Sequence, residues 1–225
     1  MTETPAIEVK NLKVIYNENT PNEIVALNSF SLKVKRGEVL VVTGGNGTGK
    51  STLLNAIAGT IPIQSGHILF NGNDITDWST AQRAKIMGIV YQDTMLGTCP
   101  NLSLHENFQL TNIHKWWLPI PYKLIMSKNQ INSIQKIGLG LESRMATKIN
   151  MLSGGQRQAI AVCLAFENDK PILLFDEFTS ALDEPTMLNL MNYTISQSIQ
   201  YHTTVIIVMH NTERVEGLCN NILRL

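Results

Sequence analysis

Residues 44–51 read GGNGTGKS, and only Thr43 separates them from the apolar run VLVV at residues 39–42. The eight residues fit the phosphate-loop pattern G-x-x-x-x-G-K-[ST], in which backbone N–H groups of a glycine-rich loop surround phosphate oxygens. The apolar run predicts a buried strand, and residues 52–58 predict a helix that ends at Gly59. The N-terminus of that helix adds positive potential at the loop. The sequence therefore predicts a nucleotide-binding loop between a strand and a helix.

Two side chains at the end of the loop have defined roles in this pattern. Lys50 is expected to reach the β- and γ-phosphates of the nucleotide, and the hydroxyl of Ser51 is expected to bind Mg²⁺. The alternative is a chance match, which the strand and helix patterns on either side of the loop disfavour. The residues expected to contact the nucleotide here are Gly44, Gly45, Asn46, Gly47, Thr48, Gly49, Lys50, Ser51 and Thr52.

The composition of the chain argues against several classes of protein. Its 225 residues are 44% apolar, which is enough for one large domain or two small ones with a substantial core. Eighteen basic residues balance eighteen acidic ones without a basic stripe, so no nucleic-acid partner is expected. The three cysteines lack metal-ligand spacing and suit a reducing cytosol. No signal peptide and no membrane-length apolar run is visible, so attachment to a membrane would need another chain.

Short apolar runs alternate with helix-like segments along much of the chain. Unbroken apolar strands that alternate with helices predict an α/β fold with a parallel sheet covered on both faces. Strands are expected at residues 7–9, 12–16, 30–34, 39–42, 67–70, 86–90, 172–175 and 204–209. Helices are expected at residues 52–58, 104–111, 128–137, 156–166 and 187–200.

Two acidic residues, Asp176 and Glu177, follow the expected strand at residues 172–175. Ligand groups of parallel sheets gather at the carboxyl ends of the strands, which places Asp176 near the Mg²⁺ of the phosphate loop. Glu177 is one residue further on, where it could polarise an attacking water molecule. The alternative is an ordinary solvated acidic turn, and the phosphate loop elsewhere in the chain favours the functional interpretation.

A second anion-binding pattern, LSGGQ, occupies residues 152–156 directly before an amphipathic helix. Ser153 could cap that helix, while Gly154 and Gly155 leave backbone N–H groups free to meet an anion. The alternative is a capped helix after a flexible turn. Because the chain already has one phosphate loop, a second phosphate-binding pattern suggests a site that serves the nucleotide of another molecule.

Taken in order, these motifs resemble those of the ATP-binding subunits of ABC transporters. LSGGQ at residues 152–156 is similar to the signature motif of that family, and Gln92 to its Q-loop glutamine. SALD, which ends at Asp183, resembles its D-loop, and His210 after the last expected strand resembles its switch histidine. Tyr16 stands where the family has an aromatic residue that stacks on adenine, although a tyrosine in a strand is more often a packing residue. The resemblance extends from Ile7 to Leu225.

The resemblance implies a P-loop NTPase fold of the ABC type, with a mainly parallel sheet core, an antiparallel β subdomain and an inserted helical subdomain. The chain would then be a single ABC ATPase domain, residues 1–225. Its core would comprise residues 1–94 and 150–225, with the helical subdomain at about residues 95–149. This subdomain normally contacts a membrane permease. Four large side chains in this segment would suit that contact if they were exposed. The favoured interpretation is that they fill the subdomain's own small core. They are Trp116, Trp117, Ile120 and Tyr122.

The resemblance also implies a mechanism in which two copies of the domain face each other head to tail around ATP. Ser153, Gly154, Gly155 and Gln156 of one copy would close on the γ-phosphate that the phosphate loop of the other copy holds. Both sites look intact, so a homodimer is expected. Mg²⁺ would be held by Ser51, Asp176 and Gln92. The other implied roles are Glu177 as general base or water-positioning residue, His210 and Lys50 as contacts of the γ-phosphate, and Tyr16 and Asp183 as nucleotide-binding residues.

Three stretches resemble a narrower group, the bacterial importer ATPases that accompany branched-chain-amino-acid-type permeases, some linked to aromatic amino acids. They lie at residues 54–60, 92–98 and 203–211. Phe178 departs from that group, where His often occupies the position. The expected partners are integral membrane permease subunits and a periplasmic substrate-binding protein. The expected location is the cytoplasm, peripheral on the inner face of the cell membrane.

Two other functions stay open at this stage. One is an ATPase of a lipoprotein or lipid extraction or export system, which sequence motifs alone do not separate from an importer. The other is an ABC ATPase that acts on ribosomes or DNA. Proteins of that kind usually carry two nucleotide domains, a long coiled-coil insertion or a basic surface, and this sequence shows none of them.

Overall fold

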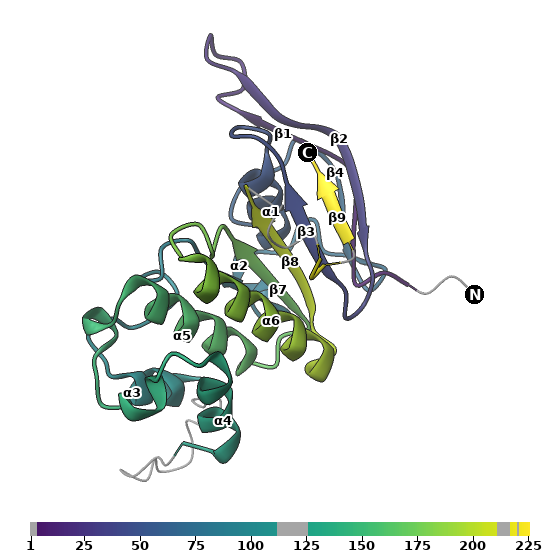
Figure 1. Ribbon diagram of the computed structural model, residues 1–225. Helices are drawn as coiled ribbons and strands as arrows, with labels where there is room; N and C mark the ends of the chain where they lie inside the picture. Colours follow the sequence, from purple (N-terminus) through teal and green to yellow (C-terminus); the bar gives the residue numbers. More distant parts are fainter. Residues whose placement is uncertain (1–3, 112–125, 211–216, 220) are drawn as a thin grey trace.

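The structure of the protein is a computed structural model that describes residues 4–111, 126–210, 217–219 and 221–225. Part of the expected helical subdomain, with the four candidates for contact with a permease, lies outside the described residues. These candidates are Trp116, Trp117, Ile120 and Tyr122. Figure 1 shows the described chain as a parallel sheet with helices on both sides and an antiparallel sheet next to it. The α/β fold class expected from the sequence is thereby confirmed.

A five-stranded sheet in which every neighbouring pair is parallel forms the centre of the molecule. The sequence predicted four of these strands to within one residue at each end. The fifth, β9, was missed because its four residues carry no long apolar run. In spatial order the strands are β6 (Met87–Val90), β7 (Ile172–Asp176), β8 (Thr204–Met209), β3 (Val39–Thr43) and β9 (Asn221–Arg224).

Both faces of the parallel sheet are buried, as its unbroken apolar strands predicted. Successive residues of β3 show this: Val41 belongs to one hydrophobic cluster, while Leu40 and Val42 belong to another. The cluster around Val41 is covered by α5 (Gly154–Phe166) and α6 (Glu184–Tyr201), and the other by α1 (Lys50–Ala58) and the antiparallel sheet. The sheet therefore holds its strand ends rigidly, with helices on each side.

The antiparallel sheet packs its apolar face on α1. Residues 7–9 and 12–16, expected as two strands, form one strand that continues through an irregularity at Asn11, whose φ is +47°. A bulge of this kind interrupts the pairing without ending the strand, so the polar residues between the two apolar runs did not mark a turn. The strands in spatial order are β2 (Ile24–Val34), β1 (Ile7–Tyr16), β4 (Ser65–Phe70) and β5 (Asn73–Asp74).

Two longer helices, α3 (Leu104–Leu110) and α4 (Lys128–Ile137), lie between β6 and α5 in the chain, close to the positions predicted. Each begins at a serine whose side chain forms a capping box, Ser103 for α3 and Ser127 for α4. Their buried residues share one hydrophobic cluster with α5 and α6. Two 3-10 turns, η2 (Leu141–Ser143) and η3 (Ile149–Met151), complete this region. Its separation as a helical subdomain stays a prediction.

No helix within the described part of the chain is both long and apolar enough to cross a lipid bilayer.

Arg83, at the end of the short helix α2 (Thr80–Arg83), binds the C-terminus of α1, a contact that the sequence did not predict. Its Nη1 donates to the backbone oxygens of Ala56 (2.8 Å) and Ile57 (2.7 Å), and its Nη2 donates to that of Thr76 (2.6 Å). The last carbonyl groups of a helix have no partner within the helix and carry negative partial charge, which a cation satisfies. Because only 3% of Arg83 is exposed, these bonds are protected from water.

Replacing Arg83 with Met keeps the apolar stem and removes the three hydrogen bonds. Since hydrogen bonds to a charged donor contribute about 1.5–3 kcal/mol, we expect Arg83→Met to lower the free energy of unfolding by about 3 kcal/mol. The thermal midpoint should fall by about 6–12 °C in calorimetry. The exposed Arg36 supplies the control: Arg36→Met should stay within about 0.5 kcal/mol of the wild type. Equal midpoints for the two variants would contradict the role of Arg83.

Candidate functional site

The glycine loop runs from the end of β3 to the first turn of α1, and its backbone conformation requires glycine. Gly49 precedes α1 with φ +94°, and a Cβ atom there would lie 2.5 Å from the backbone oxygen of Ala26. Gly47 also has positive φ, +77°. No side chain caps α1, so the N–H groups of its first turn are left to a ligand. The loop therefore has the geometry of an anion site at a helix N-terminus.

Lys50 lies over the loop, where the sequence placed a contact with phosphate. Its Nζ donates to the backbone oxygens of Gly44 (2.9 Å) and Gly45 (2.7 Å), and only 4% of the residue is exposed. The ammonium group is thus buried against neutral carbonyl groups, without a carboxylate as ion-pair partner among the described contacts. A phosphate in the loop would supply the missing negative charge within reach of Nζ.

Ser51 and Asp176 form the part of the site that could hold a metal ion. The Ser51 hydroxyl donates to Oδ1 of Asp176 at 3.2 Å, so that α1 and the end of β7 meet through these two side chains. Burial raises the pKa of the Asp176 carboxyl, and the hydrogen bond from Ser51 opposes that rise. A cation would favour the ionised form of such a carboxylate. The described residues contain no cluster of three or more metal-ligating side chains. One hydroxyl and one carboxylate nevertheless suit Mg²⁺, which takes its other ligands from phosphates and water.

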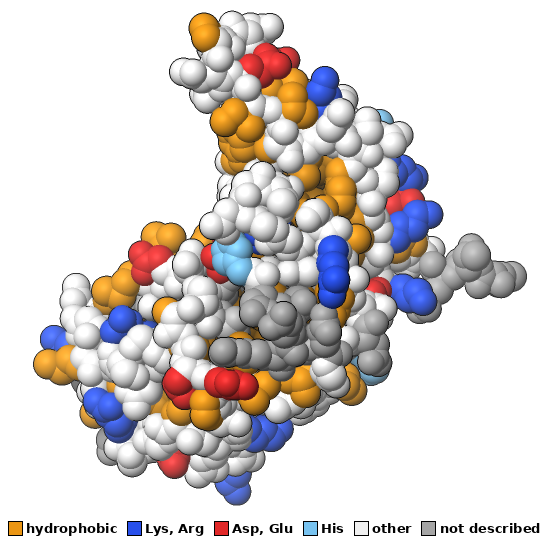
Figure 2. Space-filling model, turned by 45° about the horizontal axis from the view of Figure 1, so that its top comes forward, with side chains coloured by type: hydrophobic (Ala, Val, Ile, Leu, Met, Phe, Trp, Pro, Cys, Tyr) orange, Lys and Arg blue, Asp and Glu red, His pale blue; other side chains and the backbone are white. Residues whose placement is uncertain are grey.

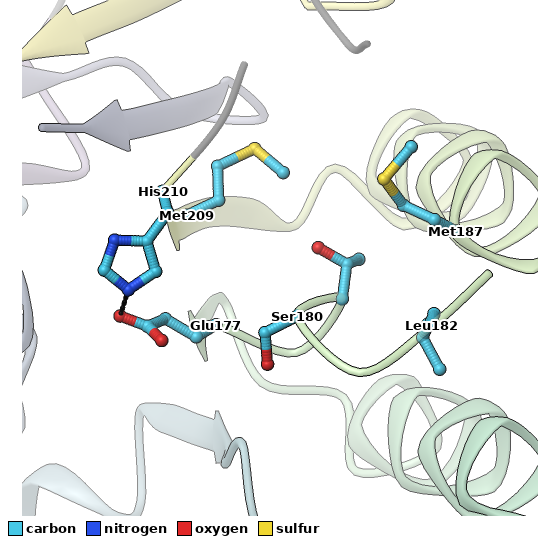
Figure 3. A pocket seen from close by; sticks show the side chains of 7 residues that line it. Glu177, Ser180, Leu182, Met187, Met209 and His210 are labelled. Carbon is cyan, nitrogen blue, oxygen red and sulfur yellow. Dashed lines mark ion pairs between the residues drawn. The ribbon is translucent and has the colours of Figure 1, made fainter. Parts of the chain in front are cut away.

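Glu177 and His210 face each other at the carboxyl ends of β7 and β8. Nε2 of His210 lies 2.7 Å from Oε1 of Glu177 (Figure 3). Glu177 has φ +45°, a left-handed conformation that costs a residue other than glycine about 1–2 kcal/mol. The hydrogen bond from its backbone N–H to the Val208 oxygen (3.0 Å) holds the turn to β8. The strained turn directs the carboxylate toward the histidine.

Most of the residues that line a cavity of about 480 Å³ are ones that the sequence singled out. Tyr16 and Ile24, which face each other in the β1–β2 pairing, line one part of it. The hydroxyl groups of Tyr16 and Thr52 lie 3.2 Å apart, which fixes the ring next to α1. The candidate residues that share the cavity are Tyr16, Asn46, Gly47, Gly49, Lys50, Ser51, Thr52, Glu177 and His210.

A second cavity of about 320 Å³ lies beside the same Glu177–His210 pair, and no sequence pattern indicated it. Figure 3 shows its other side chains, from the turn after β7, the start of α6 and the end of β8. Ser180 in this wall accepts a hydrogen bond from Nε2 of Gln92 at 3.2 Å. Gln92 therefore contacts the turn that follows Glu177, while its expected contact with a metal ion stays a prediction.

The signature residues are well ordered but lie apart from the glycine loop. Ser153 caps α5 as predicted: its hydroxyl accepts from the Gln156 N–H and its own N–H donates to the Gln156 side chain. Arg144 also donates to the Gln156 side chain, at 3.0 Å. Asp183 caps α6 through the Thr186 N–H. Neither residues 153–156 nor Asp183 line the cavity of this chain's own phosphate loop.

Comparison with known proteins agrees with this site. Residues 27–180 match the family model described as ABC transporter. The tyrosine transport ATP-binding protein of Clostridioides difficile is 34% identical over 209 residues, which cover 91% of this chain and 82% of that protein. The macrolide export ATP-binding/permease protein MacB of Pasteurella multocida is 32% identical, over 92% of this chain and 31% of that protein. The solved dimeric, post-hydrolysis structure of the ATP-binding cassette MJ0796 with ADP and Pi has a TM-score of 0.79 at 28% identity, covering 97% of this chain and 94% of that one.

The buried carboxyl of Asp176 gives a stability test. Its pKa is higher in the folded protein than in the unfolded chain, so stability falls as the pH rises from the unfolded value, about 4, through the folded value. At pH 7 and without Mg²⁺, Asp176→Asn should therefore raise the thermal midpoint, by about 2–4 °C for each kcal/mol of desolvation removed. This gain in the thermal midpoint should disappear at low pH. The Asp176→Asn variant should not hydrolyse ATP at either pH.

The exposed Glu18 provides the control, since Glu18→Gln also removes one carboxylate and should leave the midpoint unchanged at both pH values. A fall in the midpoint of Asp176→Asn at pH 7 in a chelating buffer would contradict the argument from burial.

Proposed function

The chain belongs to the ABC transporter family and is an ATPase subunit, and we propose that it drives solute import through a membrane permease. The observation that carries the proposal is that Lys50, Ser51, Glu177 and His210 line one cavity. In addition, Ser51 contacts Asp176 and Glu177 contacts His210. Phosphate binding, metal binding and activation of water are the functions that transfer of a phosphoryl group to water requires. The likeness to a tyrosine transport ATP-binding protein supports the role in solute transport.

Each group at the cavity has a place in this mechanism. The loop N–H groups and Lys50 bind the phosphates, and Tyr16 stacks on the base. Ser51 and Asp176 hold Mg²⁺, which supplies charge neutralisation on the phosphates when bound. Glu177 orients a water molecule and accepts its proton. His210, whose imidazole contacts the Glu177 carboxylate, also contacts the γ-phosphate. Gln92 links the turn after Glu177 to the helical region.

A second copy of the chain completes the site in this proposal. Residues 153–156 present the N-terminus of the 13-residue helix α5, with the Gly154 and Gly155 N–H groups in its first turn. This arrangement suits an anion, yet it lies outside the cavity of its own loop. The dimeric state of the related cassette supports pairing of two such chains. In a homodimer each signature helix would close on the ATP held by the partner's loop.

Location and further partners follow from the motor role. The permease would hold the chain at the inner face of the cell membrane, and a periplasmic binding protein would deliver the solute. The core of residues 1–94 and 150–225 would bind ATP, and residues 95–149 would act as the helical subdomain that contacts the permease. The ATPase of a lipoprotein or lipid extraction or export system is the second candidate, and the similarity to a macrolide export protein favours export within it.

A ribosomal or DNA-bound role has less support. On the face drawn in Figure 2, acidic and basic side chains are interspersed, with no extended basic patch. The net charge of zero agrees with that distribution, since a nucleic-acid partner favours a basic surface.

Glu177→Gln keeps the shape of the side chain and removes its charge. We expect the variant to bind ATP, to hydrolyse it at least about 100-fold more slowly, and to accumulate as an ATP-bound dimer. Light scattering coupled to size exclusion measures the dimer, and phosphate release measures hydrolysis. The exposed Glu142 gives the control, because Glu142→Gln should behave as the wild type. A Glu177→Gln protein that stays monomeric with ATP, where the wild type dimerises, would contradict the shared site.

The transport proposal is tested by purifying the tagged chain from membranes of its native host in mild detergent. A multi-span permease should co-purify with it, and mass spectrometry identifies both. A periplasmic binding protein encoded next to that permease would favour import over extraction. Ribosomal proteins without a permease would leave the ATPase assignment intact and overturn the transport role.

A further inference from the structure

Thr43 is a buried polar residue that none of the sequence motifs includes. It is the last residue of β3, directly before the glycine loop, and 6% of it is exposed. In the parallel pairing of β3 with β8 it lies opposite Met209. The next residue of that chain segment is His210. Thr43 thus joins the start of the phosphate loop to the strand that carries the histidine.

The hydroxyl of Thr43 donates a hydrogen bond to the backbone oxygen of His210 at 3.2 Å. This bond lies just beyond the end of β8, where the strand pairing no longer constrains the backbone. The side chain of His210 projects from the same residue, and its Nε2 lies 2.7 Å from the Glu177 carboxylate. Fixing the His210 peptide therefore fixes the origin from which the imidazole reaches Glu177.

The same residue is coupled to the loop that receives phosphate. The backbone oxygen of Gly44, the next residue, accepts a hydrogen bond from Nζ of Lys50 at 2.9 Å. The backbone oxygen of Thr43 accepts from the Leu225 N–H at 2.8 Å, so its peptide is held on the β9 side as well. Thr43 therefore connects two parts of the site: its peptide adjoins the phosphate loop, and its hydroxyl binds the backbone of His210.

We propose that Thr43 is a positioning residue for ATP hydrolysis, which sets the orientation of His210 toward Glu177 and the γ-phosphate through its hydrogen bond to the His210 backbone. The inference rests on the proposed role of His210. Thr43 does not line the described nucleotide cavity, so its effect is on the chemical step and not on ATP binding.

The test compares Thr43→Val, which has the same shape without the hydroxyl, with Thr43→Ser, which keeps the hydroxyl. Loss of one net hydrogen bond corresponds to about a fivefold change in an equilibrium or a rate. We expect Thr43→Val to lower the kcat for ATP about fivefold and to change KM less than about twofold. Thr43→Ser should stay within about twofold of the wild type in both constants.

Thr204 provides a matched control for the loss of a buried threonine hydroxyl. It lies at the opposite end of β8 with 1% of the residue exposed, accepts from the Gly37 N–H at 3.1 Å and donates to the Lys35 oxygen at 3.4 Å. Thr204→Val should lower the thermal midpoint and leave kcat unchanged. If kcat falls in Thr43→Val but not in Thr204→Val, a general loss of stability does not explain the fall.

A second readout does not depend on hydrolysis. The chain has five histidines, and the His210 imidazole signal in a nuclear magnetic resonance spectrum is the one that His210→Ala removes. Thr43→Val should shift or broaden that signal in the nucleotide-free protein, while Thr204→Val should not. If Thr43→Val shifts the His210 signal but the wild type does not hydrolyse ATP, the positioning of His210 is supported and the proposed function is contradicted. The two failures can therefore be told apart.

Two outcomes would overturn the proposal. One is an unchanged His210 signal in Thr43→Val together with wild-type kcat. The other is an equal loss of kcat in Thr43→Val and Thr43→Ser, which would show that the loss does not follow the presence of the hydroxyl and therefore does not come from the hydrogen bond.

Discussion

The register of the three central parallel strands is the constraint on which the site depends. Thr43 of β3 pairs with Met209 of β8, and Asp176 of β7 pairs with Val208 of β8. Because parallel strands end at the same edge, this register brings the glycine loop, the acidic turn and His210 together. Residues more than 160 positions apart in the chain, such as Thr43 and His210, then meet at 3.2 Å. A shift of one strand would separate Asp176 from Ser51 at the end of the phosphate loop.

The sequence predicted the elements whose pattern is local and missed those that depend on distant contacts. Apolar runs such as residues 204–209, and the Ser153 cap of α5, carry their own signal. Strand β9 has only four residues, and it forms because β3 offers an open edge. The role of Arg83 depends on the carbonyl groups at the end of α1, 26 residues away, which no local pattern around Arg83 indicates. The sequence therefore did not predict hydrogen bonds between polar groups that lie far apart in the chain.

The candidate site shows the same division. Fixed-spacing motifs led to Lys50, Ser51 and Asp176, and the structure brings these three together. The contact of Gln92 with Ser180 and the hydrogen bond of Thr43 were missed, because each joins side chains from different strands or turns. The signature residues at 153–156 were predicted from the sequence, yet the fold of one chain leaves them away from the loop. The role proposed for them requires an assembly, which a single chain's pattern indicates only indirectly.

Three features of the isolated site are unfavourable for the fold by themselves. A lysine is buried against neutral carbonyl groups, the Asp176 carboxyl is desolvated, and Glu177 adopts a left-handed backbone. Strain and unbalanced charge of this kind concentrate where a ligand supplies the missing interaction. Phosphate would offset the charge of Lys50, and a cation would offset that of Asp176. The two groups are linked through α1, since Lys50 and Ser51 are consecutive residues, so binding of a metal–nucleotide complex would satisfy both at once. Nucleotide without a metal ion would satisfy only the lysine and would leave the desolvated Asp176 carboxyl without a compensating cation.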